Sequence, residues 1–149
     1  MRRLIASSLG LGLIPRRLWG SDSGAGTFGA AFAAGIGGLL LWANAPWWVT
    51  LAIAVALTCV ALWAAVPFAH GDPGWVCIDE TAGTMIALVG LSGPAWIVAL
   101  VVARLADIFK VLPGIRRAEG LRGTAGITAD DVLAGLYGLG AGWLVTALI

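Results

Sequence analysis

The sequence predicts an all-α membrane protein, a helical bundle with about three spanning helices plus a broken or re-entrant helical hairpin. Of the 149 residues, 60% are hydrophobic and only 11% are charged, and the mean hydropathy is +0.95. A soluble domain carries about a quarter of its residues as charged ones. The apolar residues also gather in blocks near the length of about 20 residues that a spanning helix needs. Residues 1–149 are therefore expected to form one integral-membrane domain.

The N-terminal stretch Leu4–Ile14 is apolar and follows Arg2 and Arg3, as in a signal peptide. Small residues should follow at a cleavage site, but Pro15-Arg16-Arg17 stands there instead. At about 11 residues, the stretch is too short to cross a bilayer, which takes about 20. An interfacial or re-entrant segment is expected.

Four apolar blocks follow, and they set the predicted topology. Asn44-Ala45-Pro46 predicts a tight turn, so the first two blocks should form an antiparallel helical hairpin. The third block is long enough to span but is broken by "LSGPAW", residues 91–96. The blocks are Phe28–Trp42, Trp47–Phe68, Met85–Leu105 and Val132–Ile149.

The basic residues predict how the third block is arranged. Lys and Arg lie before the first hairpin and between the third and last blocks, whereas the 43–46 turn has none. If both basic regions are cytoplasmic, the third block enters and leaves on one side. The break at Ser92-Gly93-Pro94 allows this as two short half-helices in a re-entrant hairpin. That arrangement puts six charged residues at one membrane face: Asp79, Glu80, Arg104, Asp107, Asp130 and Asp131.

Two adjacent acid pairs, Asp79-Glu80 and Asp130-Asp131, each precede an apolar block. Helix capping is one interpretation, because an acid in the first turn is worth about 0.3–1 kcal/mol. Thr128-x-x-Asp131 even has the form of a capping box. One acid is enough for a cap, however, and two adjacent acids near a bilayer repel and lose solvation. A functional site is therefore an equal alternative.

The segment "ARLADIFKVLP" spaces Arg104, Asp107 and Lys110 three residues apart, which puts them on one helix face. They could form a salt-bridge ladder. Alternatively, Asp107 could hold a cation while Arg104 and Lys110 hold an anion. Pro113 is expected to end this helix.

A glycine-rich stretch at 23–38 has two interpretations as well. It could serve the close packing of membrane helices. Alternatively, the turn Gly26–Gly29 could lead into a helix whose N-terminal amides face a phosphate. Carboxylates and basic groups at one membrane face together suit a divalent cation, Mg²⁺ or Mn²⁺, with a phosphate ligand.

Several other classes are disfavoured. Basic residues form no stripe, the net charge is +1 and there is one Tyr, so no nucleic-acid partner is expected. Cys59 and Cys77 are isolated, which predicts neither a disulfide framework nor a zinc site. Cys77 is not followed by a Cys-x₅-Arg loop, and His70 is the single histidine.

Four patches of the chain resemble the bacterial phosphatidylglycerophosphatase A family. The three downstream patches match an Asp-Glu-x-x-Gly motif, an Arg-x-x-Asp-x-x-Lys-x-x-Pro segment and a Gly-x-x-Gly-x-x-x-Asp-Asp-x-x-Ala-Gly ending. The patches are "LGLGLIP" with "GTFGAAFA" (9–15 and 26–33), "IDETAGTMIAL" (78–88), "ARLADIFKVLP" (103–113) and "GTAGITADDVLAGLYG" (123–138).

This resemblance implies a Mg²⁺-dependent lipid phosphatase in phospholipid biosynthesis. Such an enzyme converts phosphatidylglycerophosphate in the bilayer to phosphatidylglycerol and phosphate. It would be a multi-pass protein of the bacterial inner membrane, with its active site on the cytoplasmic side. Functional roles are implied for Thr27, Asp79, Glu80, Arg104, Asp107, Lys110, Asp130 and Asp131.

We expect those roles to divide by charge. The five acids would be catalytic, binding metal and positioning or activating water, with Asp79, Glu80, Asp107 and Asp131 as the metal ligands. The substrate phosphate would be bound by Arg104 and Lys110, with backbone donors from Gly26 and Thr27.

The chain departs from the family at a few positions. Ala25 stands where the family usually has Pro, and "RRAEGLRGTAG" replaces a stretch with an Asp-Arg pair and a His-Gly-Gly turn. No role is carried onto Glu119 or Arg122.

Three alternatives remain open. A cation- or proton-coupled transporter would use the same acids as an ion path and should place at least one in mid-span. A CDP-alcohol phosphotransferase should show an Asp-Gly-x-x-Ala-Arg pattern, which this sequence lacks. In a scaffold without activity, the acids would serve only as caps.

Overall fold

The computed structural model describes residues 1–71 and 73–149, which form helices and turns without a strand. This confirms the predicted all-α class. Within these described residues, three helices, α3, α4 and α8, are long and apolar enough to cross a membrane. In chain order the elements are α1 (Arg2–Ala6), η1 (Leu11–Leu13), α2 (Ile14–Trp19), α3 (Ala25–Trp42), α4 (Trp47–Ala64), η2 (Val66–Phe68), α5 (Ile78–Ala87), α6 (Gly93–Phe109), α7 (Ile115–Glu119) and α8 (Thr124–Leu148).

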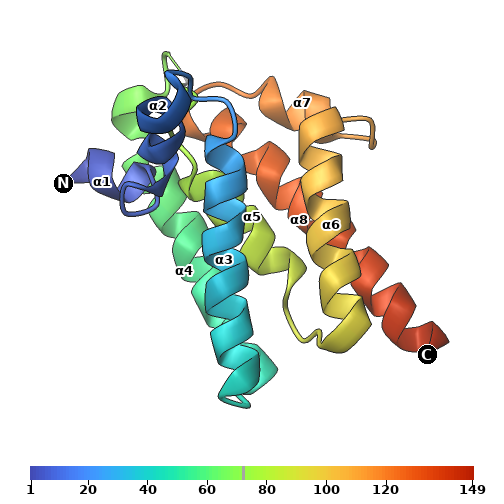
Figure 1. Cartoon of the computed structure of the whole chain (residues 1–149). Helices are drawn as coiled ribbons and strands as arrows, with labels where there is room; N and C mark the ends of the chain where they lie inside the picture. The colour runs from blue at the N-terminus through green and yellow to red at the C-terminus, as the bar shows by residue number, and fades with distance from the viewer. Residues whose placement is uncertain (72) are drawn as a thin grey trace.

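Helices α3 and α4 form the predicted antiparallel hairpin, joined at residues 43–46 (Figure 1). Helix α4 ends at Ala64, before the predicted Phe68. Pro67 explains the difference, since a proline ring cannot continue an α-helix and here sits in the short 3₁₀ turn η2.

The third block is broken as predicted, but its two arms are unequal. Helix α5 begins at Ile78, before the predicted Met85, and ends at Ala87. Helix α6 begins at Gly93 with Pro94 in its first turn and runs for 17 residues, so it is not a short half-helix. The chain runs down α5, turns at residues 88–92 and returns along α6 toward the end where α7 lies (Figure 1).

Helix α8 packs against both arms of this hairpin through small residues. A side chain at Gly83 of α5 would collide with the backbone of Asp131, and one at Gly135 would collide with the backbone of Gly83. Helices α5 and α8 therefore approach to backbone contact, as small residues allow in membrane bundles. Because Asp79 and Asp131 each lie one turn before these glycines, the crossing fixes both acids near each other.

The N-terminal segment holds the start of α5 in place. The Cys77 amide donates to the Ala6 carbonyl at 2.9 Å. The Ser8 hydroxyl lies 3.1 Å from the Cys77 carbonyl and 2.7 Å from the Thr81 hydroxyl. These bonds give the segment expected at the membrane interface a structural task, since it anchors the helix that carries Asp79.

Charge is concentrated toward one end of the bundle. Helices α1, α2 and α7 lie in its upper part in Figure 1, opposite the turn between α3 and α4. The nine Lys and Arg residues belong to these helices, to the last turns of α6 with Lys110, and to the turn at 120–123. The predicted gathering of charge at one end is thus present.

Candidate active site

An acid-lined cavity of about 270 Å³ lies where the start of α5, the end of α6 and the first turns of α8 meet. Ala69, Pro73, Gly74 and Val76, which follow α4, line it on one side. Its charged lining consists of Asp79, Glu80, Asp107, Lys110, Glu119, Asp130 and Asp131. The structure therefore brings together all five acids that the sequence singled out, from three separate segments.

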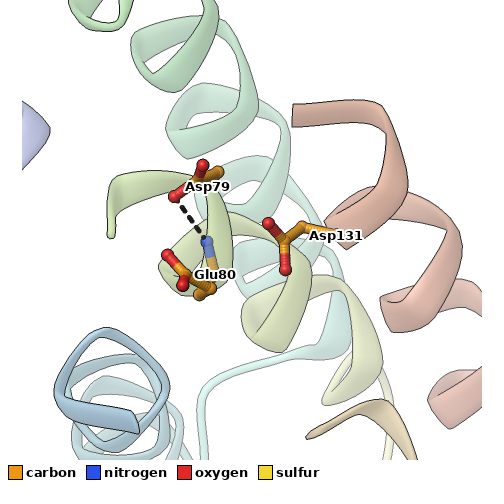
Figure 2. A group of neighbouring side chains, drawn as sticks. All are labelled: Asp79, Glu80 and Asp131. Atoms are coloured by element: carbon orange, nitrogen blue, oxygen red, sulfur yellow. Dashed lines mark hydrogen bonds between the residues drawn. The ribbon is translucent and has the colours of Figure 1, made fainter. Parts of the chain in front are cut away.

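Asp79 and Glu80 occupy the first turn of α5. The Glu80 amide donates to the Asp79 Oδ1 at 3.1 Å, the bond drawn in Figure 2. Since the first amides of a helix lack intrahelical acceptors, Asp79 stabilises the helix start from within its first turn. Glu80 does not share this task and points into the protein. The N-cap residue itself, Cys77, makes no side-chain cap bond with the described residues.

One oxygen of the Glu80 carboxylate, Oε2, is buried and accepts no hydrogen bond from the described residues, 1–71 and 73–149. Burial raises the pKa of Glu80 well above its usual range, and the charges of Asp79 and Asp131 raise it further. A cation at this position would stabilise the charged form of Glu80 and so lower its pKa.

The position of Asp130 and Asp131 rules out the capping interpretation for this pair. Helix α8 begins at Thr124 after Gly123, eight residues before the predicted Val132, so both acids and Thr128 lie inside the helix. No side chain caps this start, and the proposed Thr128–Asp131 capping box does not form. The predicted start at Val132 was wrong because Asp130 and Asp131 interrupt the apolar run, whereas the helix continues through them from Thr124.

Asp131 is shared by two groups of three carboxylates. In each group, one oxygen from every residue lies within 4.8 Å of the others. Figure 2 shows Asp131 reaching from α8 toward the pair on α5. The groups are Asp79, Glu80 and Asp131, and Asp107, Asp130 and Asp131. Both offer the hard oxygen ligands that Mg²⁺ prefers.

The basic side chains pair with these acids in part as predicted. Arg104 Nη1 donates to Asp107 Oδ2 at 2.6 Å, which is one step of the predicted ladder. Lys110 does not continue it, because α6 ends at Phe109 and Lys110 adopts a left-handed conformation with φ of 49°. The helix thus ends before Pro113, the residue expected to end it.

Lys110 instead binds across to α8 and α7. Its Nζ lies 2.6 Å from Asp130 Oδ2 and 2.7 Å from Glu119 Oε1. Partial burial lowers the pKa of Lys110, but the hydrogen bonds and charges of Asp130 and Glu119 outweigh burial and raise it overall. Lys110 therefore stays charged near neutral pH.

Of the two glycine-loop residues predicted to contact phosphate, only Gly26 lies against the acids. A side chain at Gly26 would collide with the Glu80 carboxylate and crowd Arg104. The Thr27 side chain is exposed, and its amide donates to the Gly24 carbonyl at 3.0 Å. Gly26 thus permits Glu80 and Arg104 to approach α3 closely.

Sequence reasoning missed one lining residue of the cavity, Glu119, and misassigned Thr128, which is not among the lining residues. Glu119 was assigned no role, yet it holds Lys110; the opposite charges nine residues apart around Pro113-Gly114 were the available signal. Thr128 was interpreted as a cap, yet its hydroxyl is buried without a partner in the described chain. No simple pattern in the sequence marks that hydroxyl.

Comparisons with known proteins agree with these motifs. A 98-residue stretch is 37% identical to a Bacteroides thetaiotaomicron protein named "Putative phosphatidylinositol-3-phosphatase", covering 60% of this chain and 61% of that protein. The match thus spans less than two thirds of the relative's length. No solved structure matches the chain. The family model described as Phosphatidylglycerophosphatase A matches residues 4–146, so the chain belongs to the phosphatidylglycerophosphatase A family.

Proposed function

We propose that this protein is a Mg²⁺-dependent lipid phosphatase that hydrolyses phosphatidylglycerophosphate to phosphatidylglycerol and phosphate. The observation that carries the proposal is Asp131, whose carboxylate completes two groups of three acids in one cavity. Family membership supports the same activity. It also weighs against the transporter and phosphotransferase alternatives.

The acids present fit a divalent cation. Glu80 Oε2 and Asp130 Oδ1 are buried and have no partner in the described part of the chain. Asp79, Asp130 and Asp131 are each at most 6% exposed, so their charges are poorly solvated. Asp79, Glu80, Asp107 and Asp131 would hold the ion, with Asp130 at the second group. A bound Mg²⁺ supplies charge neutralisation to the phosphate and a more acidic water.

The chain's own residues would orient the phosphate. Arg104 can donate from the guanidinium nitrogen that does not bind Asp107, toward the space beside Gly26 and Glu80. Asp107 fixes the plane of that guanidinium. Lys110 adds a positive charge at the rim and holds Asp130 in place. A carboxylate of the cavity would accept a proton from the attacking water.

The proposed location is the bacterial inner membrane, with the cavity on the cytoplasmic side. Basic flanking residues mark cytoplasmic ends of membrane helices. Here they lie in α1, α2, α7 and the end of α6, which also contributes Asp107 and Lys110 to the cavity.

The test is phosphate release by the purified protein in detergent micelles. We expect release from phosphatidylglycerophosphate with Mg²⁺, loss in excess chelator, and recovery when Mg²⁺ is restored. Asp79→Asn and Asp131→Asn should lose activity, whereas Asp22→Asn, which removes an acid outside the cavity, should keep it.

Two outcomes would revise the proposal. Release that persists in chelator and in both cavity variants would contradict the metal–carboxylate mechanism. Faster release from phosphatidylinositol 3-phosphate, the lipid suggested by the name of the relative, would reassign the substrate while keeping the reaction.

A further inference from the structure

A second cavity, a groove of about 310 Å³, lies between α4 and α8 with the end of α5 as its floor. Its nine lining residues include no charged side chain. The hydroxyl of Thr58, one of them, already donates to the Ala54 carbonyl at 2.9 Å. The groove therefore offers contacts only to an apolar ligand.

The groove lies below the acid cavity along two helices. On α5, Asp79, Gly83 and Ile86 share one face, so the floor of the groove continues the face that carries the acid. On α8, Leu136 follows Asp131 by about 7.5 Å along the helix axis. Both compartments are therefore reached along the same pair of packed helices.

The α4 side shows the same order. Val55, Cys59 and Leu62 lie on one face of α4, and Val55 and Cys59 line the groove. Beyond the end of α4, Ala69 and Pro73 line the acid cavity. Helices α4 and α8 are both long and apolar enough to cross a membrane, and the groove lies near the middle of each of them.

We propose that the groove binds an acyl chain of the same phospholipid molecule whose phosphate headgroup occupies the acid cavity. This inference rests on the proposed function and specifies how the substrate enters, sideways from the bilayer between α4 and α8. A phospholipid joins a charged headgroup to apolar chains, in the order in which the two compartments lie.

A helix from a second copy of the protein is a poorer fit. A standard protein interface takes about 20–30 residues from each side. The nine residues of the groove are few by comparison, and they form a channel over α5. A single acyl chain needs no larger surface.

The first experiment fills the groove and uses a matched control. Val55 of α4 is 55% exposed and lines the groove, whereas Val101 of α6 is 48% exposed and lies on another helix. We expect Val55→Trp to raise KM for long-chain phosphatidylglycerophosphate about tenfold, the effect of losing contact with about two methylene groups. Turnover of the deacylated headgroup should not change, and Val101→Trp should affect neither substrate. An unchanged KM, or equal loss with both substrates, would overturn the proposal.

The second experiment needs no turnover. Cys59 is exposed in the groove and Cys77 is buried, so N-ethylmaleimide, which is small and enters micelles, should modify Cys59 selectively. The reaction should be slow, because few thiolates form in apolar surroundings. We expect a phosphonate analogue of phosphatidylglycerophosphate to slow this modification several-fold more than phosphatidylcholine with the same chains. Cys59→Ser supplies the background.

Each alternative has its own signature in that assay. Equal protection by both lipids, or protection by neither, would overturn the link between groove and headgroup cavity. Protection that grows with protein concentration in the absence of lipid would assign the groove to a second copy. Selective protection without any phosphate release would support the groove while contradicting the phosphatase proposal.

Discussion

The two acid pairs look alike in the sequence but do different work in the structure. Asp79 lies in the first turn of α5 and accepts the Glu80 amide. Asp130 and Asp131 lie in the second turn of α8, where the backbone amides already have intrahelical acceptors. Asp79 thus stabilises its helix start, and Asp130 gains the ion pair with Lys110. Asp131, by contrast, makes no bond to a helix-start amide that would offset its burial. That difference makes Asp131 the stronger functional residue.

Asp131→Asn tests the difference between the two pairs most directly and should have the largest effect. We expect phosphate release to fall by about 100-fold or more, as for loss of a main electrostatic contact in an active site. Stability in chelator should not fall, because the change removes a buried charge that other carboxylates repel. The measurements are phosphate release and thermal unfolding in micelles.

The same variant also reports on metal binding. Mg²⁺ at about 100 times its Kd should stabilise the wild type by about 2.7 kcal/mol. Asp131→Asn should lose most of that increment, whereas Asp22→Asn should retain it. If Asp131→Asn unfolds at a lower temperature than the wild type in chelator, Asp131 stabilises the fold, which would contradict a purely functional role.

Much of the fold could be predicted because apolar blocks and breakers are local signals. Composition gave the class, and Ser92-Gly93-Pro94 gave the break between α5 and α6. The start of α8 could not be predicted the same way. Asp130 and Asp131 interrupt the apolar pattern in its second turn. The helix nevertheless extends back to Thr124 because α8 packs on α5 and α6, as the contact between Gly83 and Gly135 shows.

The acids of the site could be predicted from the sequence, but the contacts between its acidic and basic side chains were harder to predict. The two acid pairs and Asp107 were identified from their spacing and from the family motifs. The Lys110 contacts with Asp130 and Glu119 depend on how α6 ends and how α7 folds back, which is tertiary information. The role of Gly26 beside Glu80 is also a product of packing, since α3 and α5 are distant in the sequence.

Lys110→Met should have the next largest effect. It distinguishes Asp130, which binds Lys110, from its neighbour Asp131. It leaves Asp130 buried without its ion-pair partner, which costs about 1–3 kcal/mol of unfolding free energy. Adding Asp130→Asn should recover most of that stability but not the activity. The double-mutant cycle is measured by unfolding in micelles. If Asp130→Asn recovers nothing, Lys110 stabilises the protein mainly through Glu119.

Replacements at Asp79 should separate its two tasks. Asp79→Asn keeps an oxygen acceptor for the Glu80 amide, so it should lose activity with little change in stability. Asp79→Ala also removes the acceptor and should cost a further ~0.5–1.5 kcal/mol, the net contribution of one hydrogen bond. Comparison of the two unfolding free energies isolates the contribution to the helix start. Equal stability of the two variants would mean that the bond from the Glu80 amide to Asp79 does not stabilise the start of α5.

The smallest effect is expected at Cys77. Of the two acid pairs, only the first contributes a charge, that of Asp79, that shifts the pKa of this thiol. Burial, with a smaller contribution from the Asp79 charge, raises the pKa of Cys77 to about 11 against the opposing hydrogen bonds of Ser8 and Gly12. At pH 8, three units below that pKa, the thiolate fraction is about 10⁻³, so modification is slow. Asp79→Asn removes a charge that disfavours the thiolate. It should therefore lower the pKa and raise the modification rate slightly.

Modification rates between pH 7 and pH 10 in a Cys59→Ser background would measure this shift. Asp131→Asn should leave the Cys77 rate unchanged, because Asp131 is not among the charges that shift the Cys77 pKa. A larger response to Asp131→Asn than to Asp79→Asn would mean that the two pairs act as one electrostatic unit. In that case the two acid pairs would have the same electrostatic role despite their different positions in α5 and α8. Only the bond that Asp79 accepts from the Glu80 amide would then distinguish the first pair from the second.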